Sequence, residues 1–209
     1  MAENDLINTE TTIHQSKESV DADVENLVYE FLRDRLRKRG YNFPLPEKRR
    51  NARRTIEADV GTALRQLADE FISQYREQFN EMCSQLTLTV DTVNVTIEGV
   101  ANELFGEGIR WARIVAFFVF GSELAIHCID RNAQELVNIL ADSISSYVTK
   151  TLLPWIKHHG GWSGLVQFME EGRNVEGETG GRWPSVKNLI CIGMTAVGAI
   201  TIGAVLSRT

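Results

Sequence analysis

The side chains best able to do chemistry in this sequence are two pairs, His127-Cys128 and His158-His159. Adjacent residues do not share a helix face, so neither pair can close on one metal ion, and no CxxC or HxxxH spacing supports zinc. Cys128 lacks an accompanying acid or oxyanion-binding element that would make it a nucleophile. Nucleotide-binding glycine patterns are also absent. We therefore expect no enzymatic activity, no cofactor and no metal site, and we interpret Cys128 as a core thiol.

A second kind of chemistry, the recognition of an anion, is suggested by Arg110 and Arg113. They lie in Asn102–Phe120, NELFGEGIRWARIVAFFVF, which opens polar and becomes apolar after Gly108. A helix that begins near Gly108 would place both arginines in its first turn, three residues apart on one face. The positive end of the helix macrodipole disfavours cations there. Either both arginines are solvated on a surface helix, or an anion supplied by something else balances them, and we favour the anion.

The composition indicates one domain with appendages in a reducing compartment. The chain has 209 residues, of which 22 are basic and 28 acidic, and the net charge of −6 disfavours nucleic-acid binding. Cations crowd into Arg33–Arg54, which we interpret as a helix C-terminal end and a solvated loop rather than a nuclear or lipid-binding address. Cys83, Cys128 and Cys191 show no paired spacing. The polar first twenty residues contain no apolar signal segment.

The uncharged run Leu189–Leu206 predicts a membrane anchor near the C-terminus. At about 1.5 Å per residue it spans roughly 27 Å as a helix, just enough for a bilayer core. Arg182 and Lys187 precede it and Arg208 follows it, while a glycine-rich stretch separates it from the preceding sequence. The alternative is a buried core helix, which the glycine-rich tether disfavours.

The elements that must position the arginines are amphipathic helices. Apolar residues recur with a helical period over Val24–Leu36 and again over Ile56–Tyr75. Asp21 or Asp23 can cap the start of the first helix, and Gly40 its end. The central helix reaches about Ile129, Asp130-Arg131-Asn132 makes a turn, and Leu136–Val148 forms the next helix. The central helix is expected to be buried on nearly all sides.

The central stretch also resembles the first homology region of the Bcl-2 family, which reads NELF…NWGRIVAFF…FG. The matching residues are Asn102–Phe105, Trp111, Arg113–Phe118 and Phe120-Gly121. The sequence departs from the family at Arg110-Trp111-Ala112-Arg113, where the family has Asn-Trp-Gly-Arg. Three other segments resemble family motifs. The BH3-like motif contains Leu64, Leu67, Ala68 and Asp69; Pro154–Ile156 with Gly160–Trp162 resembles the second homology region, and Val24–Tyr41 the fourth.

The resemblance implies an all-α fold, a bundle of about eight helices around a buried central hairpin, with a C-terminal transmembrane helix. We expect a disordered N-terminal tail over residues 1–22, a helical domain over 23–170, a flexible linker over 171–185 and an anchor over 186–207. One segment gives conflicting signals. Leu86–Ile97 alternates apolar and polar residues like a strand, whereas the family places a short, irregular third helix and the start of the fourth there. We follow the family.

The resemblance further implies that a hydrophobic groove binds BH3 helices of pro-apoptotic relatives. Arg113 matches the arginine that receives the BH3 aspartate, and each apolar groove residue could equally be a core residue. The expected partner-binding residues are Phe71, Tyr75, Phe79, Met82, Val100, Leu104, Arg110, Ala112, Arg113, Ala116 and Phe120.

Two functions compete at this stage. The first is a pro-survival protein that sequesters BH3 helices at the mitochondrial outer membrane, with the endoplasmic reticulum as the other expected location. The second is a pro-apoptotic effector whose own Leu64–Asp69 segment is released for assembly into pores. The complete first helix and the sequence of Phe117–Gly121 favour the pro-survival function. Homodimers or heterodimers with relatives are compatible with either function.

Overall fold

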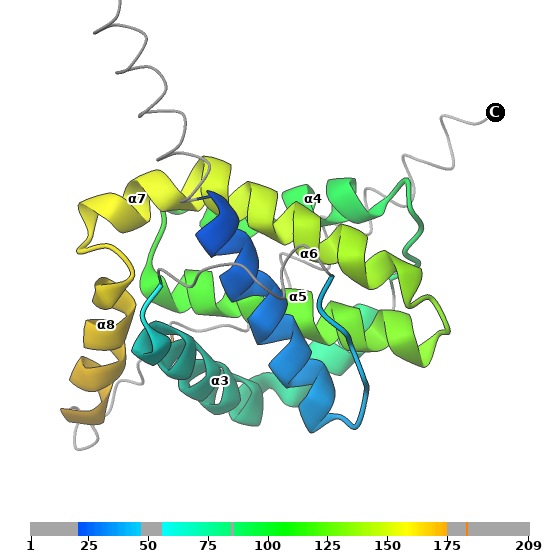
Figure 1. The fold of residues 1–209 in the computed structure, drawn as a ribbon, viewed down its shortest axis with the longest axis horizontal. Helices are drawn as coiled ribbons and strands as arrows, with labels where there is room; N and C mark the ends of the chain where they lie inside the picture. Colours follow the sequence, from blue (N-terminus) through cyan, green and yellow to red (C-terminus); the bar gives the residue numbers. More distant parts are fainter. Residues whose placement is uncertain (1–20, 47–55, 85, 175–182, 184–209) are drawn as a thin grey trace, which may run out of the picture.

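The computed structural model describes residues 21–46, 56–84, 86–174 and 183, and these form a helical bundle (Figure 1). The first helix covers residues 21–38. The later elements are α3 (Ala58–Ser84), α4 (Val93–Phe105), α5 (Trp111–Asp130), α6 (Glu135–Tyr147), the π-helical turn η1 (Val148–Leu152), α7 (Leu153–His158) and α8 (Ser163–Asn174). These described ranges contain no strand, so the predicted all-α class is confirmed.

Helix α5 is the centre of the bundle, as the sequence predicted. It is long and apolar enough to cross a membrane, but 89% of its most apolar window is buried inside the protein. Helices α3, α4 and α6 pack against it, and the first helix adds the edge-to-face contact of Phe31 with Phe118, 5.5 Å between ring centroids. The apolar sequence of α5 is therefore explained by its place in the protein core.

Helices α5 and α6 form the expected hairpin and approach each other closely at Gly121. A Cβ atom at this position would lie 2.3 Å from Cδ1 of Ile144, well inside van der Waals contact. The turn between the two helices places Asn132 in the left-handed region, at a φ of 59°. Asparagine tolerates this conformation better than most residues do. The predicted turn at Asp130–Asn132 is thus present, with Asp130 as the last residue of α5.

The predicted end of the first helix is confirmed at Gly40. Gly40 has a φ of +84°, its N–H donates to the Arg37 carbonyl at 2.9 Å, and the Tyr41 N–H donates to the Leu36 carbonyl at 3.0 Å. This pair of hydrogen bonds is a Schellman motif, which satisfies the last carbonyls of the helix. Asp21 and Asp23, proposed as caps, both lie inside the helix.

The segment with conflicting signals divides at Val93. Residues 86–89 are irregular, 90–92 form a turn, and Val93–Ile97 are the first turns of α4. The start of α4 agrees with the family resemblance, but the expected third helix is not in this segment. Instead α3 continues to Ser84 with a break at Tyr75, where φ is −127° and ψ is 17°. The apolar residues Leu86, Val93 and Ile97 are buried without forming a strand.

Two predicted segments lie largely outside the described residues. The N-terminal tail is one, and the anchor over 186–207 is the other. The predicted linker over 171–185 overlaps the end of α8, which continues to Asn174. Trp183 is the linker residue beyond α8 that the structure describes, and its side chain is buried.

Candidate partner-binding site

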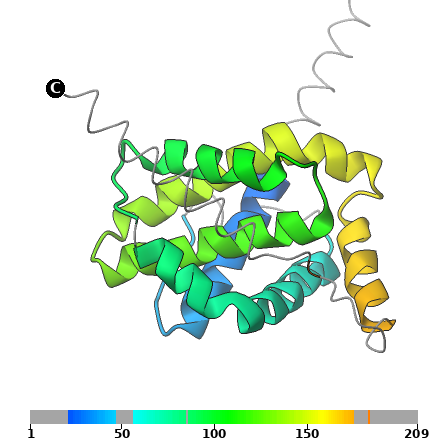
Figure 2. The same ribbon diagram turned by 180° about the vertical axis from the view of Figure 1, so that it is seen from behind.

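The predicted partner-binding residues come from α3, α4 and α5. Figure 2 shows α5 running between α4 and the C-terminal half of α3. Both neighbours pack against α5 but have no comparable contact with each other. The three helices therefore share one side of the bundle, with α5 as the floor between α3 and α4.

Most of the predicted partner-binding residues are buried in the free chain. Tyr75 is half-buried and Arg110 is exposed. The buried members are Phe71, Phe79, Met82, Val100, Leu104, Ala112, Arg113, Ala116 and Phe120. The apolar members belong to the continuous hydrophobic core, so in the free chain they pack as core residues. A helix that uses them must first make them accessible.

Two surface hollows are lined by other residues. One, of about 350 Å³, lies between the first helix and the start of α3, beside Asn26, Asp34 and Arg65. The other, of about 580 Å³, lies between α4 and α6, beside Asn94, Asp142 and Tyr147. Neither includes a predicted partner-binding residue, and both are lined largely by polar and charged side chains. They are less suited to an apolar helix face than the α3–α4–α5 surface is.

Arg113 has a nearly buried guanidinium with an incomplete set of partners. Its side chain is 8% exposed. Nη1 donates to the Gly108 carbonyl at 2.9 Å, and Nη2 donates to Oε2 of Glu107 at 2.5 Å. Nε is buried and has no hydrogen-bond partner among the described residues. Since an unpaired buried donor costs free energy, this N–H is a place where an additional acceptor would be stabilised.

The start of α5 explains this geometry and corrects the sequence analysis. Gly108 has a φ of +102° and Arg110 is extended, at φ −148° and ψ 154°, so the chain is not helical before Trp111. Arg113 is thus in the first turn, as predicted, whereas Arg110 is the capping residue and not part of that turn. The same bend turns the Gly108 carbonyl back toward the guanidinium of Arg113.

The counter-anion of Arg113 in the free chain is a neighbour in the sequence. The sequence analysis expected an anion supplied by something else, and Glu107, six residues earlier, pairs with Arg113 in the free chain. The Glu107 side chain is 83% exposed and that of Arg113 only 8%. A solvated carboxylate therefore screens a buried cation that the helix macrodipole disfavours. The sequence signal for this pair is the acid between Gly106 and Gly108.

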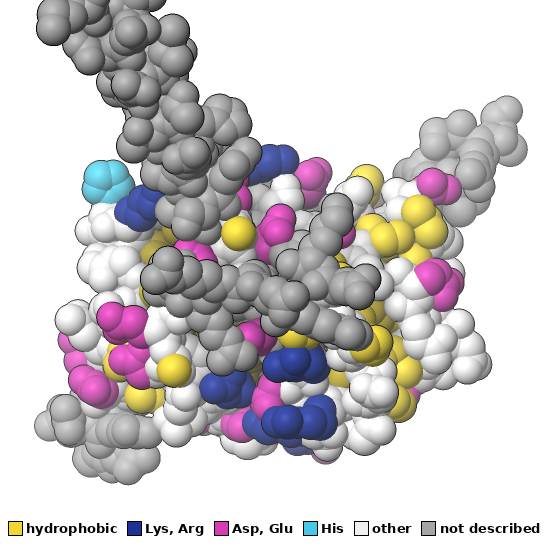
Figure 3. All heavy atoms as spheres, viewed as in Figure 1, with side chains coloured by type: hydrophobic (Ala, Val, Ile, Leu, Met, Phe, Trp, Pro, Cys, Tyr) yellow, Lys and Arg dark blue, Asp and Glu magenta, His cyan; other side chains and the backbone are white. Residues whose placement is uncertain are grey.

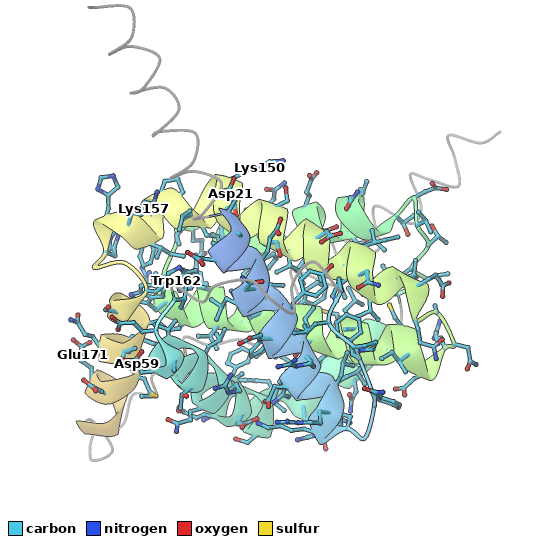
Figure 4. The ribbon with its side chains drawn as sticks, viewed as in Figure 1. Asp21, Asp59, Lys150, Lys157, Trp162 and Glu171 are labelled. Carbon is cyan, nitrogen blue, oxygen red and sulfur yellow. The ribbon has the colours of Figure 1, made fainter. Side chains whose placement is uncertain are left out.

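Aromatic residues of the two homology regions fix the beginning of α5. The ring of Trp111 lies 5.3 Å from that of Trp155 and 6.4 Å from that of Trp162. Trp162 lies at the junction of α7 and α8 (Figure 4). Gly164 permits this approach, because a Cβ there would lie 2.9 Å from the Trp111 ring. The motif residues thus position the turn that carries Arg113 rather than forming a separate site.

Trp183 covers one of the predicted partner-binding residues. Its ring centroid is 5.0 Å from that of Phe71 and 6.1 Å from that of Phe168, and its Nε1 donates to Oε1 of Glu70 at 2.8 Å. The sequence analysis missed this residue because it assigned the whole stretch to a flexible tether. The available signal was a lone tryptophan in an otherwise glycine-rich and acidic segment.

The chain's own BH3-like motif is buried and bound by the first helix. Leu64, Leu67 and Ala68 are fully buried in the core. Asp69 accepts hydrogen bonds from Nη1 of Arg35 at 2.5 Å and from Nζ of Lys38 at 2.7 Å. The apolar face of the motif is therefore occupied by the core, while the half-exposed Asp69 is paired with the first helix.

A buried charge cluster extends this contact to α5. Arg35 is 5% exposed and pairs through Nη2 with Oε1 of Glu123 at 3.3 Å, and Arg39 reaches Oε2 of Glu123 at 3.4 Å. Basic and acidic side chains interleave over this end of the first helix (Figure 3). Arg35 lies in the part of Arg33–Arg54 that was predicted to end a helix, and there it neutralises a carboxylate inside the core.

The two described cysteines have the environment of core thiols. Cys83 and Cys128 are free and buried. Burial raises the pKa of Cys83 to about 12, with a further contribution from the charge of Glu123, and burial raises the pKa of Cys128 to about 11. Among the described residues, no three His, Cys, Asp or Glu side chains are grouped to hold a metal ion.

Comparisons with known proteins agree with this architecture. The model of the family described as "Apoptosis regulator proteins, Bcl-2 family" matches residues 64–162. Human Bcl-2-like protein 1 is 38% identical over 151 residues, 72% of this chain and 64% of that protein. Chicken apoptosis regulator Bcl-2 is 36% identical over 150 residues, 71% of this chain and 63% of that protein. The chain thus spans slightly less than two thirds of these relatives.

A solved structure matches over nearly its full length. The crystal structure of Trichoplax adhaerens trBcl-2L2 bound to trBak BH3 has a TM-score of 0.62 and 30% sequence identity, and the match covers 70% of this chain and 97% of that chain. The described helices therefore define a Bcl-2-like bundle. Together with the family-model match, this similarity shows that the chain belongs to the Bcl-2 family of apoptosis regulators.

Proposed function

We propose that this chain is a pro-survival regulator of apoptosis that sequesters BH3 helices of pro-apoptotic relatives. The binding surface is the side of the bundle formed by α3, α4 and α5. The observation that carries the proposal is Arg113, a buried cation with an unpaired Nε, beside a large set of apolar residues on the same three helices. A helix with an apolar face and one carboxylate complements both features.

The carboxylate is the more specific part of this complementarity. A planar guanidinium can pair with a carboxylate through two parallel hydrogen bonds, and a lysine cannot reproduce that geometry. The related Trichoplax protein was crystallised bound to a BH3 segment, which supports the same mode for this chain. Because Trp183 lies on Phe71, a helix that uses Phe71 has to displace this tryptophan.

The alternative is an effector that permeabilises membranes, and the state of the BH3-like motif favours the pro-survival role. An effector has to release this motif from its own bundle. Here Leu64, Leu67 and Ala68 would leave the core, and Asp69 would leave Arg35 and Lys38. Both changes disfavour release of the motif, because buried apolar surface becomes exposed and the ion pairs of Asp69 are broken.

The proposed location is the cytosolic face of the mitochondrial outer membrane, and the endoplasmic reticulum is the second candidate. The uncharged run Leu189–Leu206, which lies outside the described residues, is the proposed anchor. Its flanking cations and modest hydrophobicity are the sequence features that support this assignment.

Dye-filled liposomes of mitochondrial lipid composition test the functional class. The full chain is added alone, then with a BH3 peptide, and binding of the peptide is measured in parallel by calorimetry. We expect the chain to bind the peptide and to release no dye in either condition. Dye release by the chain alone would contradict the pro-survival role, and failure to bind any BH3 peptide would contradict the binding mode.

A further inference from the structure

We propose that Glu107 is an internal competitor for the partner's carboxylate, so that a partner has to displace it from Arg113 to bind with full affinity. The inference rests on the proposed function and adds a specificity-determining residue to it. Glu107 lies in the connection between α4 and α5 and is bound to the same guanidinium that the partner is expected to use.

The hydrogen bonds of Arg113 show where the competition takes place. Nη1 is engaged by the Gly108 carbonyl, which is part of the backbone of the bend and stays with it. The remaining edge of the guanidinium carries Nε and Nη2. Nε is buried and without a partner, while Nη2 is held by Glu107. A carboxylate that binds side-on uses the Nε–H and one N–H of Nη2, so it meets the like charge of the Glu107 carboxylate at Nη2 and binds fully only after Glu107 leaves.

The Glu107 carboxylate can dissociate from Arg113 easily. Its side chain is 83% exposed, and the structure gives its carboxylate no second hydrogen bond or ion pair among the described residues. Glycines on both sides allow the backbone to adjust, and Gly108 already has a φ of +102°. A released Glu107 regains full hydration, so its departure requires little reorganisation of the bundle.

The competitor has two consequences for recognition. In the free chain it keeps a buried cation paired, which stabilises the beginning of α5. During binding it lowers the apparent affinity of every ligand that needs the Nε–Nη2 edge, because part of the protein is always in the Glu107-bound form. A ligand with a carboxylate has to replace this ion pair, whereas a ligand with a neutral amide leaves it in place. Glu107 therefore weakens the binding of carboxylate ligands more than that of neutral ones, and so it reduces the preference for a carboxylate at that position.

The test is a calorimetric comparison of the full chain with its Glu107→Gln variant. Two peptides are titrated, one BH3 peptide with its aspartate and the same peptide with asparagine in its place. We expect Glu107→Gln to bind the aspartate peptide about threefold to tenfold more tightly, since one ion pair no longer has to be broken. The affinity for the asparagine peptide should change by less than about twofold, because that peptide leaves Glu107 in place.

Glu103→Gln is the matched control. Glu103 is an exposed carboxylate on α4, its removal changes the net charge by the same amount, and it is not among the described hydrogen-bond or ion-pair partners of Arg113, which are Gly108 and Glu107. If both variants bind the aspartate peptide more tightly by the same factor, the effect comes from the net charge alone, and the inference is overturned. Unchanged or weaker binding of the aspartate peptide to Glu107→Gln would also overturn it. If the unaltered chain binds neither peptide, the proposed function itself fails.

Discussion

Single residues of this chain divide into those whose role follows from type and spacing and those whose role depends on backbone geometry. Arg113 belongs to the first group, because a cation in the first turn of an apolar helix indicates a missing anion. Glu107 belongs to the second. Its contact with Arg113 exists because Gly108 and Arg110 bend the chain before Trp111, and no periodicity in the sequence predicts that bend.

Gly121 is a residue whose substitution has a predictable cost. Gly121→Ala should lower the free energy of unfolding by about 1–3 kcal/mol, because the new methyl group would overlap Ile144 in the closest part of the α5–α6 hairpin. Urea unfolding measures this directly. Gly61→Ala is the control, since a Cβ at Gly61 meets only the mobile end of Arg65, at 3.3 Å, and alanine favours the helix. Equal stability of the Gly121→Ala protein and the unaltered chain would contradict the packing described for α5 and α6.

The described cysteines should resist alkylation in the folded protein. The thiolate is the reactive form, and a pKa raised to about 11 for Cys128 and about 12 for Cys83 leaves on the order of one thiol in a thousand or fewer ionised at pH 8. Reactivity should therefore rise only as the pH approaches these values, or when denaturant exposes the thiols. Iodoacetamide labelling followed by mass spectrometry of the peptides checks this. Rapid native-state labelling of Cys128 at pH 8 would reopen the possibility of a nucleophile.

At the scale of elements, apolar periodicity predicted the helices well and their ends less well. The first helix, α5 and α6 were expected close to their observed positions, because each buries a continuous apolar stripe, whereas the start of α4 was expected from the family resemblance. The short third helix that the resemblance placed within Leu86–Ile97 was wrong. The alternation in Leu86–Ile97 satisfies a strand pattern, yet Leu86, Val93 and Ile97 reach the core from an irregular segment and a helix. The break in α3 at Tyr75 could not be predicted, because no helix-breaking residue stands there.

The contact between the first helix and α3 could not be predicted from the sequence either, because it depends on a buried charge cluster. Arg35→Ala should lower the free energy of unfolding by about 3–5 kcal/mol, since Glu123 would keep its charge in the core with only Arg39 beside it. Arg37→Ala is the control, because the Arg37 side chain is 77% exposed and its ion pair among the described residues is with Asp34 of its own helix. Urea unfolding of both variants makes the comparison. Equal effects would contradict a structural role for the cluster.

At the scale of the whole molecule, the all-α class and the central buried helix followed from the sequence, while the state of the site did not. The predicted partner-binding residues do come from the three helices α3, α4 and α5. The sequence left open whether each apolar member is a core residue, and the structure shows that most of them are buried in the free chain. The contact of Trp183 with Phe71 could not be predicted. A resemblance identifies which residues can contact a partner, but the free chain packs the same apolar side chains for its own stability.

The central claim is that a BH3 helix binds this side of the bundle through Arg113, and calorimetric titration of Arg113→Ala tests it most directly. One aspartate-bearing BH3 peptide is titrated into the unaltered chain, Arg113→Ala and Arg110→Ala, with circular dichroism as the check on folding. Removing one member of a desolvated interface pair costs about 2–5 kcal/mol, so Arg113→Ala should bind at least roughly 30-fold more weakly. Arg110 is exposed and precedes α5, so Arg110→Ala should weaken peptide binding by less than about tenfold. A folded Arg113→Ala protein that binds the peptide as tightly as the unaltered chain would contradict the account.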